Sequence, residues 1–168
     1  MKSAFAMIAA ALGLSLASAP ALAHDHKAKT ASAAKKTCAM ASPAALDAQF
    51  AKFNAAWATK NPDTVTALFD QDAVLLATVA ARPRTTPADI RDYFVSFLKG
   101  SPVGKIETST FKMGCNWALR AGTWTVTLTD AATGAKTDVK ARYTFLYQFD
   151  NGQWKIEHLH SSVLPANP

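Results

Sequence analysis

The spacing of apolar residues divides the chain into a helical part and a strand part. Between Ser42 and Leu98 most apolar residues recur every three or four positions, which is typical of helices that bury one face. From Gly104 onward apolar and polar residues alternate, which is typical of strands that bury one face of a sheet. This order predicts an α+β domain in which helices pack on one face of a curved antiparallel sheet.

Three helices are predicted in the first part. Ser42-Pro43, Asn61-Pro62 and Thr86-Pro87 each combine a capping side chain with a proline that suits the first helical position. The apolar stripes that follow are Leu46, Phe50, Phe53 and Trp57; Val65, Leu68 and Phe69; and Ile90, Phe94, Phe97 and Leu98. A short apolar strand is expected over residues 73–79, before a loop that prolines fix over residues 82–87.

Four consecutive strands are predicted in the second part. They span residues 105–118, 122–129, 136–149 and 153–164. Asp150-Asn151-Gly152 predicts a tight hairpin turn between the last two, because Asn and Gly accept positive φ angles. On the last strand, simple alternation places His158 and His160 on one face together with Ile156. We expect this hairpin to be central and to carry any functional site.

The first 23 residues have the features of a signal peptide. Lys2 precedes an uncharged apolar run over residues 4–17, and Ala21-Leu22-Ala23 has the small-x-small form of a cleavage site. A retained membrane anchor is the alternative, although the run is short for a bilayer. No later stretch is long and apolar enough to span one. We therefore expect a periplasmic or secreted protein without membrane attachment after cleavage.

Charge is concentrated near the N-terminus. The whole chain of 168 residues carries a net charge of +6. Setting aside Lys2 and the segment 24–37, with its four lysines and Asp25, leaves +2 for the rest. We expect residues 24–41 to form a disordered basic leader and residues 42–168 the folded domain, because the leader has too little apolar surface to fold. A nucleic-acid partner is not expected, because the folded part lacks a basic excess.

Two cysteines, Cys38 and Cys115, fit one disulfide in an oxidising compartment. Such a bond would close a long loop and stabilise the fold by roughly 4 kcal/mol in the chain-entropy model. Two separate buried thiols are the alternative.

Several motifs carry a resemblance to a known family. They are Phe53 to Trp57, Asn61-Pro62, Asp72 to Leu75, Arg82 to Pro87, Ile90 to Phe94, Gly114-Cys115-Asn116, Arg142 to Phe145 and His158 to Ser162. Over residues 46–165 the chain resembles bacterial stand-alone proteins similar to the association domain of calcium/calmodulin-dependent protein kinase II. That domain belongs to the nuclear transport factor 2-like, or SnoaL-like, superfamily. The resemblance implies a cystatin-like cone of three helices on a curved sheet, with a pocket between them.

The resemblance implies a function only in outline, because this superfamily includes isomerases, dehydratases, cyclases and pure oligomerisation modules. We expect an exported domain that forms a dimer or a larger ring, binds a small ligand, lacks a kinase domain and catalyses no reaction. The alternative is an isomerase or cyclase that uses acid/base groups. Assembly is expected through an open sheet face that carries Trp117, Trp124 or Phe111.

Candidate site residues follow from the strand pattern. The candidate ligand-binding residues are Arg142, Tyr143, Tyr147, His158 and His160. In an enzyme, His158, His160 or Asp72 would transfer protons while a tyrosine donates a hydrogen bond. The alternatives are packing histidines or half of a metal site, and for Arg142 a structural ion pair with Asp72 or Asp92.

Two further groups of residues are weaker candidates. Arg82, Arg84 and Arg91 surround the proline loop and could bind an anion, but solvated charge or a subunit contact is the other interpretation. If cleavage follows Ala23, the new N-terminus His24-Asp25-His26 could bind Cu(II) or Ni(II), with His24 and His26 as the residues involved. An accidental polar start is the alternative, and no cofactor is expected.

Overall fold

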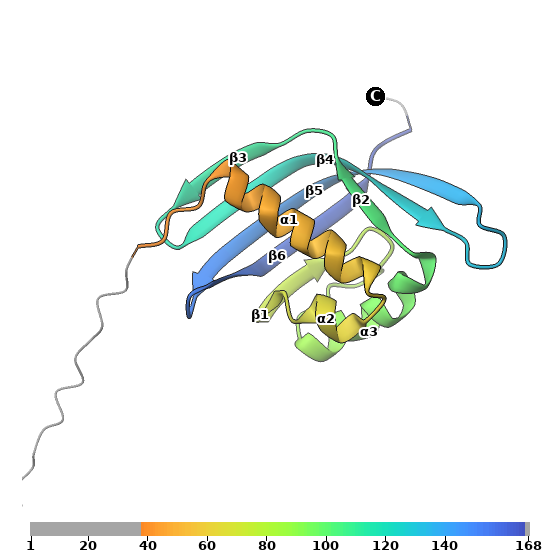
Figure 1. Ribbon diagram of the computed structural model, residues 1–168, viewed down its shortest axis with the longest axis horizontal. Coiled ribbons are helices and arrows are strands. Elements are labelled where there is room, and N and C mark those ends of the chain that lie inside the picture. The colour runs from red at the N-terminus through yellow and green to blue at the C-terminus, as the bar shows by residue number, and fades with distance from the viewer. Residues whose placement is uncertain (1–37, 167–168) are drawn as a thin grey trace, which may run out of the picture. The chain divides into compact units, whose positions relative to one another are not determined.

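A computed structural model describes residues 38–166 (Figure 1). Its helices are α1 (Pro43–Ala58), α2 (Pro62–Thr66) and α3 (Pro87–Phe97), and the last is extended by the short 3-10 turn η1 (Leu98–Gly100). Each α-helix begins as the sequence predicts. The side chains of Ser42, Asn61 and Thr86 accept hydrogen bonds from backbone N–H groups of the first turn, and a proline follows each.

Six strands form one sheet. They are β1 (Phe69–Leu76), β2 (Val103–Ile106), β3 (Thr110–Gly114), β4 (Trp117–Thr129), β5 (Lys136–Asp150) and β6 (Gln153–Val163). Their order is β1-β6-β5-β4-β2, and β3 also pairs with β4. All pairs are antiparallel except β1 with β6, so the sheet is mixed rather than purely antiparallel.

The strand predicted over residues 105–118 is two strands, and the prediction is wrong at this point. The chain leaves the sheet between β2 and β3, where Glu107 and Thr108 both donate their backbone N–H to the carbonyl of Thr123. Gly122 on β4 permits this close approach, because a Cβ atom there would lie 2.1 Å from the carbonyl oxygen of Thr108. β4 is also longer than predicted, because residues 117–121 pair with β3, and it begins at Trp117.

The helices cover one face of the sheet, here called the inner face. Figure 1 shows α1 lying across the strands, with α2 and α3 beside it near β1. The predicted stripe of α1 is buried, and Phe53 packs edge-on against Phe145 of β5 with 5.4 Å between ring centroids. The opposite face, called the outer face, is covered by none of the helices in residues 38–166. The predicted α+β arrangement of helices on a curved sheet is confirmed.

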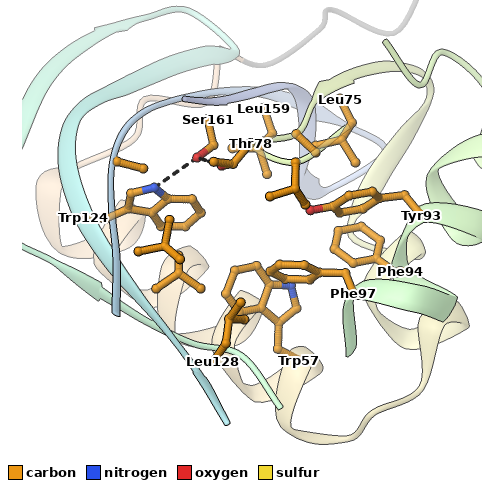
Figure 2. A pocket seen from close by; sticks show the side chains of 15 residues that line it. Trp57, Leu75, Thr78, Tyr93, Phe94, Phe97, Trp124, Leu128, Leu159 and Ser161 are labelled. Carbon is orange, nitrogen blue, oxygen red and sulfur yellow. Dashed lines mark hydrogen bonds between the residues drawn. The ribbon is translucent and has the colours of Figure 1, made fainter. Parts of the chain in front are cut away.

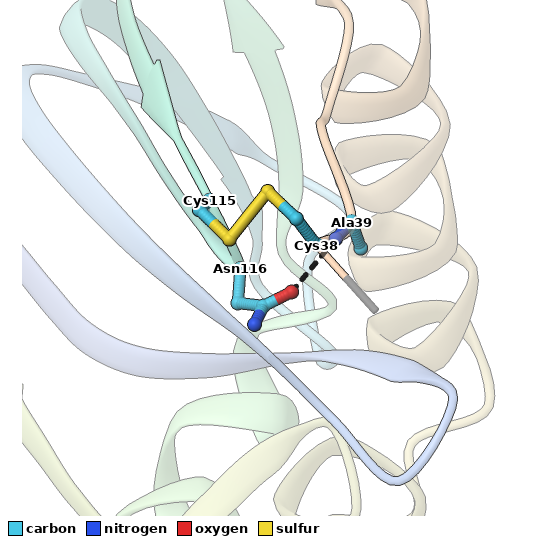
Figure 3. Close-up of a disulfide and its surroundings, with 4 residues drawn as sticks. All are labelled: Cys38, Ala39, Cys115 and Asn116. Atoms are coloured by element: carbon cyan, nitrogen blue, oxygen red, sulfur yellow. Dashed lines mark hydrogen bonds between the residues drawn. A yellow bond between two sulfur atoms is a disulfide. The ribbon is translucent and has the colours of Figure 1, made fainter. Parts of the chain in front are cut away.

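A disulfide joins Cys38 to Cys115, as predicted (Figure 3). Next to it, the backbone N–H of Ala39 donates to Asn116 Oδ1 at 2.7 Å, and the N–H of Asn116 donates to the carbonyl of Ala39 at 2.9 Å. The segment before α1 is thereby fastened to the turn between β3 and β4. The predicted signal peptide, the leader up to Thr37 and the His24/His26 metal site lie outside the described residues. Within residues 38–166, no helix combines the length and the apolar character needed to cross a membrane.

Candidate functional site

A β-bulge in β6 decides which residues reach the inner face. Ile156 pairs with Tyr147 and His158 pairs with Leu146, so Glu157 is an extra residue on β6. A bulge of one residue reverses the alternation beyond it. Ile156 is therefore buried on the inner face, whereas both histidines lie on the outer face.

His158 and His160 share a face, but it is the outer one. His158 lies between Leu146 of β5 and Val74 of β1, and His160 is exposed in the next row. Partial burial, together with the neighbouring His160, lowers the pKa of His158 below its ordinary value. Arg142 is also exposed on this face, opposite Ser162. The structure thus brings none of these three residues into the space under the helices.

Asp72 does not face that space either. It is exposed on β1, and its carboxylate forms a group with those of Asp70 and Glu157, whose ligand atoms lie within 4.8 Å of one another. Partial burial and the charges of Asp72 and Asp70 raise the pKa of Glu157. Exposed acidic groups of this kind are common on protein surfaces and indicate no catalytic site by themselves.

Arg82 and Arg84 of the proline loop and Arg91 of α3 each form an ion pair with an aspartate. Arg82 bonds to Asp89 at 2.8 Å, Arg84 to Asp92 at 3.2 Å and Arg91 to Asp63 at 2.6 Å. These pairs fasten the loop and α3 to their neighbours. Asp92 is therefore engaged by Arg84 and not by Arg142.

Tyr143 and Tyr147 are buried on the inner face, where the sequence places ligand-binding residues, but the arginine beside them is Arg120 of β4. Only 4% of Arg120 is exposed. Extending β4 back to Trp117 would have revealed it, because Arg120 alternates with Ala118 and Gly122 on the face of Trp124. The sequence analysis missed it by beginning that strand at Gly122.

Arg120 fills the end of the inner face near the disulfide. Its Nε donates to Ser109 Oγ at 2.9 Å and to the hydroxyl of Tyr143 at 3.1 Å. Its Nη2 pairs with Asp47 at 2.9 Å, and its guanidinium lies 5.5 Å from the ring centroid of Phe50. A buried guanidinium with these partners is a structural element that closes this end of the domain.

At the other end of the inner face, a cavity opens between α3 and the sheet (Figure 2). Its empty volume is ≈ 510 Å³ when the space open to solvent is included, and only ≈ 40 Å³ of it admits the centre of a water-sized sphere. Aromatic and aliphatic side chains make most of the wall, with a few hydroxyl groups. Prominent among them are Trp57, Tyr93, Phe97, Trp124, Leu159 and Ser161. None of the lining residues is Asp, Glu, Lys, Arg or His.

The lining of the cavity shows that the predicted position of Trp124 on the open sheet face is wrong. Trp124, expected on the open face, lines the cavity with only 3% of its surface exposed. Phe111 likewise turns inward, where its ring lies 5.4 Å from the guanidinium of Arg120. The bulge explains a second feature, since it turns Ser161 into the cavity. Of the three aromatic residues predicted for the outer face, Trp117 alone stays there, 39% exposed.

The family model for the SnoaL-like domain matches residues 50–156. The chain belongs to the SnoaL-like domain family. A crystal structure of a Xanthomonas campestris protein, provisionally assigned as a calcium/calmodulin dependent protein kinase II association domain, is 41% identical to this SnoaL-like domain. The match covers 77% of this chain and 95% of that one, with a TM-score of 0.71. The family resemblance predicted from the sequence is confirmed.

More distant structures share the fold of this SnoaL-like domain. A Caulobacter vibrioides protein with a cystatin-like fold is 19% identical over 74% of this chain and 90% of its own, with a TM-score of 0.60. A ketosteroid isomerase-like protein from Erwinia carotovora atroseptica is 18% identical over 73% of this chain and 95% of its own, with a TM-score of 0.59. These matches confirm the predicted cystatin-like fold. Among curated proteins, none matches this chain.

Proposed function

We propose that this SnoaL-like domain is exported, assembles through its outer sheet face and binds a small molecule in its cavity without transforming it. The observation that carries this proposal is the separation of the cavity from the acid/base candidates. The cavity is apolar and uncharged, whereas His158, His160 and Asp72 belong to the outer side of the sheet.

Proton transfer at the cavity lacks a suitable group. A general acid or base must lie within hydrogen-bond reach of its substrate and have a pKa near the working pH. The titratable side chain in the cavity wall is that of Tyr93, and burial raises its pKa, so it stays protonated. This argues against the isomerase or cyclase alternative, in which His158, His160 or Asp72 would act on a bound substrate.

Assembly is supported by one row of half-buried apolar residues on the outer face. Leu119, Leu146 and Val74 lie in one row across β4, β5 and β1, with His158 between the last two. A contiguous row of this kind, without a covering helix in residues 38–166, is typical of a surface that contacts another protein. The Xanthomonas campestris relative is named for an association domain, which agrees with a self-association role.

Export is supported by two independent features. The disulfide between Cys38 and Cys115 is compatible with an oxidising compartment. The apolar run and the Ala21-Leu22-Ala23 motif near the N-terminus have the form of a cleavable signal.

Native mass spectrometry of the protein from a periplasmic extract tests the proposal. We expect a chain that begins at His24, a dimer or larger ring, and a small organic molecule that denaturation releases unchanged. A spectrum recorded after denaturation is the control that separates a bound molecule from a covalent modification. A monomer without any bound molecule would contradict assembly and ligand binding together, and release of a chemically altered added ligand would favour the enzyme.

A further inference from the structure

The cavity presents hydrogen-bond donors without matching acceptors. Figure 2 shows the hydroxyl end of Tyr93 pointing among the lining side chains of the cavity. Trp57, 2% exposed, also lines the cavity, and its indole Nε1 is buried without a partner within residues 38–166. A buried donor without a partner is unfavourable, so the indole N–H of Trp57 favours an occupant that can accept a hydrogen bond.

Ser161 adds a third donor. Its Oγ accepts a hydrogen bond from Trp124 Nε1 at 3.2 Å and a second from the hydroxyl of Thr78. A serine hydroxyl has two acceptor positions and one proton, so with both acceptor positions used its own proton remains to be donated. Ser161 thus offers a proton to a ligand, whereas Thr78, whose own proton is donated to Ser161, presents acceptor positions.

Nothing in the cavity wall neutralises a charged ligand. Its lining residues are all uncharged. The nearby Arg84 pairs with Asp92 at 3.2 Å through Nη1, and its buried Nε has no partner within residues 38–166. Burying a carboxylate without a counter-charge costs far more than burying a neutral carbonyl group. The donors alone therefore favour a neutral acceptor over an anion.

The walls also limit the shape of the ligand. The rings of Trp57, Phe97, Tyr93 and Trp124 bound a space in which ≈ 40 Å³ is open to the centre of a water-sized sphere. A single flat ring suits a narrow space between aromatic walls, because offset and edge-on ring contacts are favourable there.

We propose that the ligand is a neutral, mostly apolar molecule about the size of one substituted ring, which presents a carbonyl-type acceptor to the hydroxyl of Tyr93. This inference rests on the proposed ligand-binding function and narrows it to a chemical class. It also assigns Tyr93 of α3, which the sequence analysis did not select, as the residue that determines specificity.

Three small molecules of nearly equal size serve as probes that distinguish a neutral acceptor from a purely apolar ligand and from an anion. Acetophenone is neutral and carries an acceptor, ethylbenzene is neutral without one, and benzoate is an anion. Each is titrated into the ¹⁵N-labelled protein at pH 7 while the indole N–H signals of Trp57 and Trp124 are followed by NMR. We expect acetophenone to bind about tenfold more tightly than ethylbenzene, the effect of one hydrogen bond, and at least tenfold more tightly than benzoate.

Tyr93→Phe tests the assigned donor and Tyr147→Phe is its matched control. Tyr147 has a buried hydroxyl without a partner in residues 38–166, but it does not line the cavity. We expect Tyr93→Phe to reduce the preference for acetophenone over ethylbenzene to about one, with ethylbenzene affinity unchanged, and Tyr147→Phe to preserve the preference. An unchanged preference in Tyr93→Phe overturns the role of Tyr93.

The probe titrations also distinguish this inference from the proposed function. Benzoate binding as tightly as acetophenone overturns the neutral class while the ligand-binding function stands. If none of the three probes shifts the indole signals, both the ligand-binding function and the inference are overturned.

Discussion

At the scale of single residues, two arginines differ in burial although their aspartate partners are equally exposed. The side chain of Arg120 is 5% exposed and pairs with Asp47, whereas that of Arg91 is 49% exposed and pairs with Asp63. We expect Asp47→Asn to lower the free energy of unfolding by about 2 kcal/mol, because it leaves a buried guanidinium without its counter-ion. Asp63→Asn is the matched control and should cause no measurable change. Urea unfolding measures both, and equal effects would contradict the structural role of Arg120.

His158 gives a prediction about pH. Its pKa in the folded protein lies below the ordinary value of 6.5, so the unfolded chain binds a proton more readily. Stability should therefore fall as pH drops below about 6.5, and His158→Gln should lose less stability between pH 7 and pH 5.5 than the wild type. The raised pKa of Glu157 acts in the opposite direction but is present in both proteins. Thermal unfolding at the two pH values measures the difference.

His160→Gln provides the control for this pH effect. It removes the neighbouring imidazole that contributes to the lowered pKa of His158, but it leaves the larger contribution from burial. We expect His160→Gln to lose less stability on acidification than the wild type and more than His158→Gln. A wild type and a His158→Gln variant that respond identically to pH would disprove the assignment.

At the scale of elements, the sequence predicts those features of helices and strands that depend only on residues close together in the chain. The starts of all three α-helices were predicted, because a capping side chain and a following proline act within one turn. The bulge at Glu157 could not be predicted, because β6 alternates evenly in sequence and only its pairing with β5 shows the extra residue. This one residue moved His158 and His160 from the expected pocket to the outer face.

The parallel pairing of β1 with β6 could not be predicted from the sequence either, because it joins segments that are separated by most of the domain. The cavity could not be predicted for the same reason, because segments distant in the chain form its wall. Tyr93 is not part of the predicted apolar stripe of α3, and it lines a cavity only because α3 meets the sheet there. Tyr143 and Tyr147, in contrast, follow the alternation of an unbroken strand, and both are buried on the inner face.

Asn54 of α1 holds the helix to the free edge of β2. Its side chain donates to the carbonyl of Gly104 at 2.7 Å and accepts from the N–H of Gly104 at 2.9 Å, as a neighbouring strand would. We expect Asn54→Ala to lower the free energy of unfolding by about 1–3 kcal/mol, since it removes the partner of two backbone groups. Amide hydrogen exchange at Gly104 should also become faster. Lys52→Ala, at an exposed site on the same helix, should change neither quantity, and slow exchange at Gly104 in Asn54→Ala would refute the prediction.

At the scale of the whole molecule, the proposed function assigns different tasks to the two faces of the sheet. The inner face divides into the end closed by Arg120 and the end with the cavity, and the bulge in β6 turns Ser161 into that cavity. The same bulge places the histidines among the apolar residues of the outer face. One local irregularity therefore separates the ligand site from the surface proposed for assembly.

That separation predicts that assembly can be removed without loss of ligand binding. Leu146 is at the centre of the outer row, between Leu119 and His158. A glutamate there would bury a charge against a second copy, which no interface tolerates without a partner group. We expect Leu146→Glu to convert the assembly to monomers in analytical ultracentrifugation, while acetophenone still shifts the indole signals of Trp57 and Trp124.

The matched control is Val95→Glu, an equivalent change at a 40% exposed apolar residue of α3 that is remote from the outer face. We expect this variant to retain the assembly of the wild type. Monomers of Val95→Glu, or an intact assembly of Leu146→Glu, would show that the chain associates through its helices instead. In that case the apolar row across β4, β5 and β1 would need another occupant.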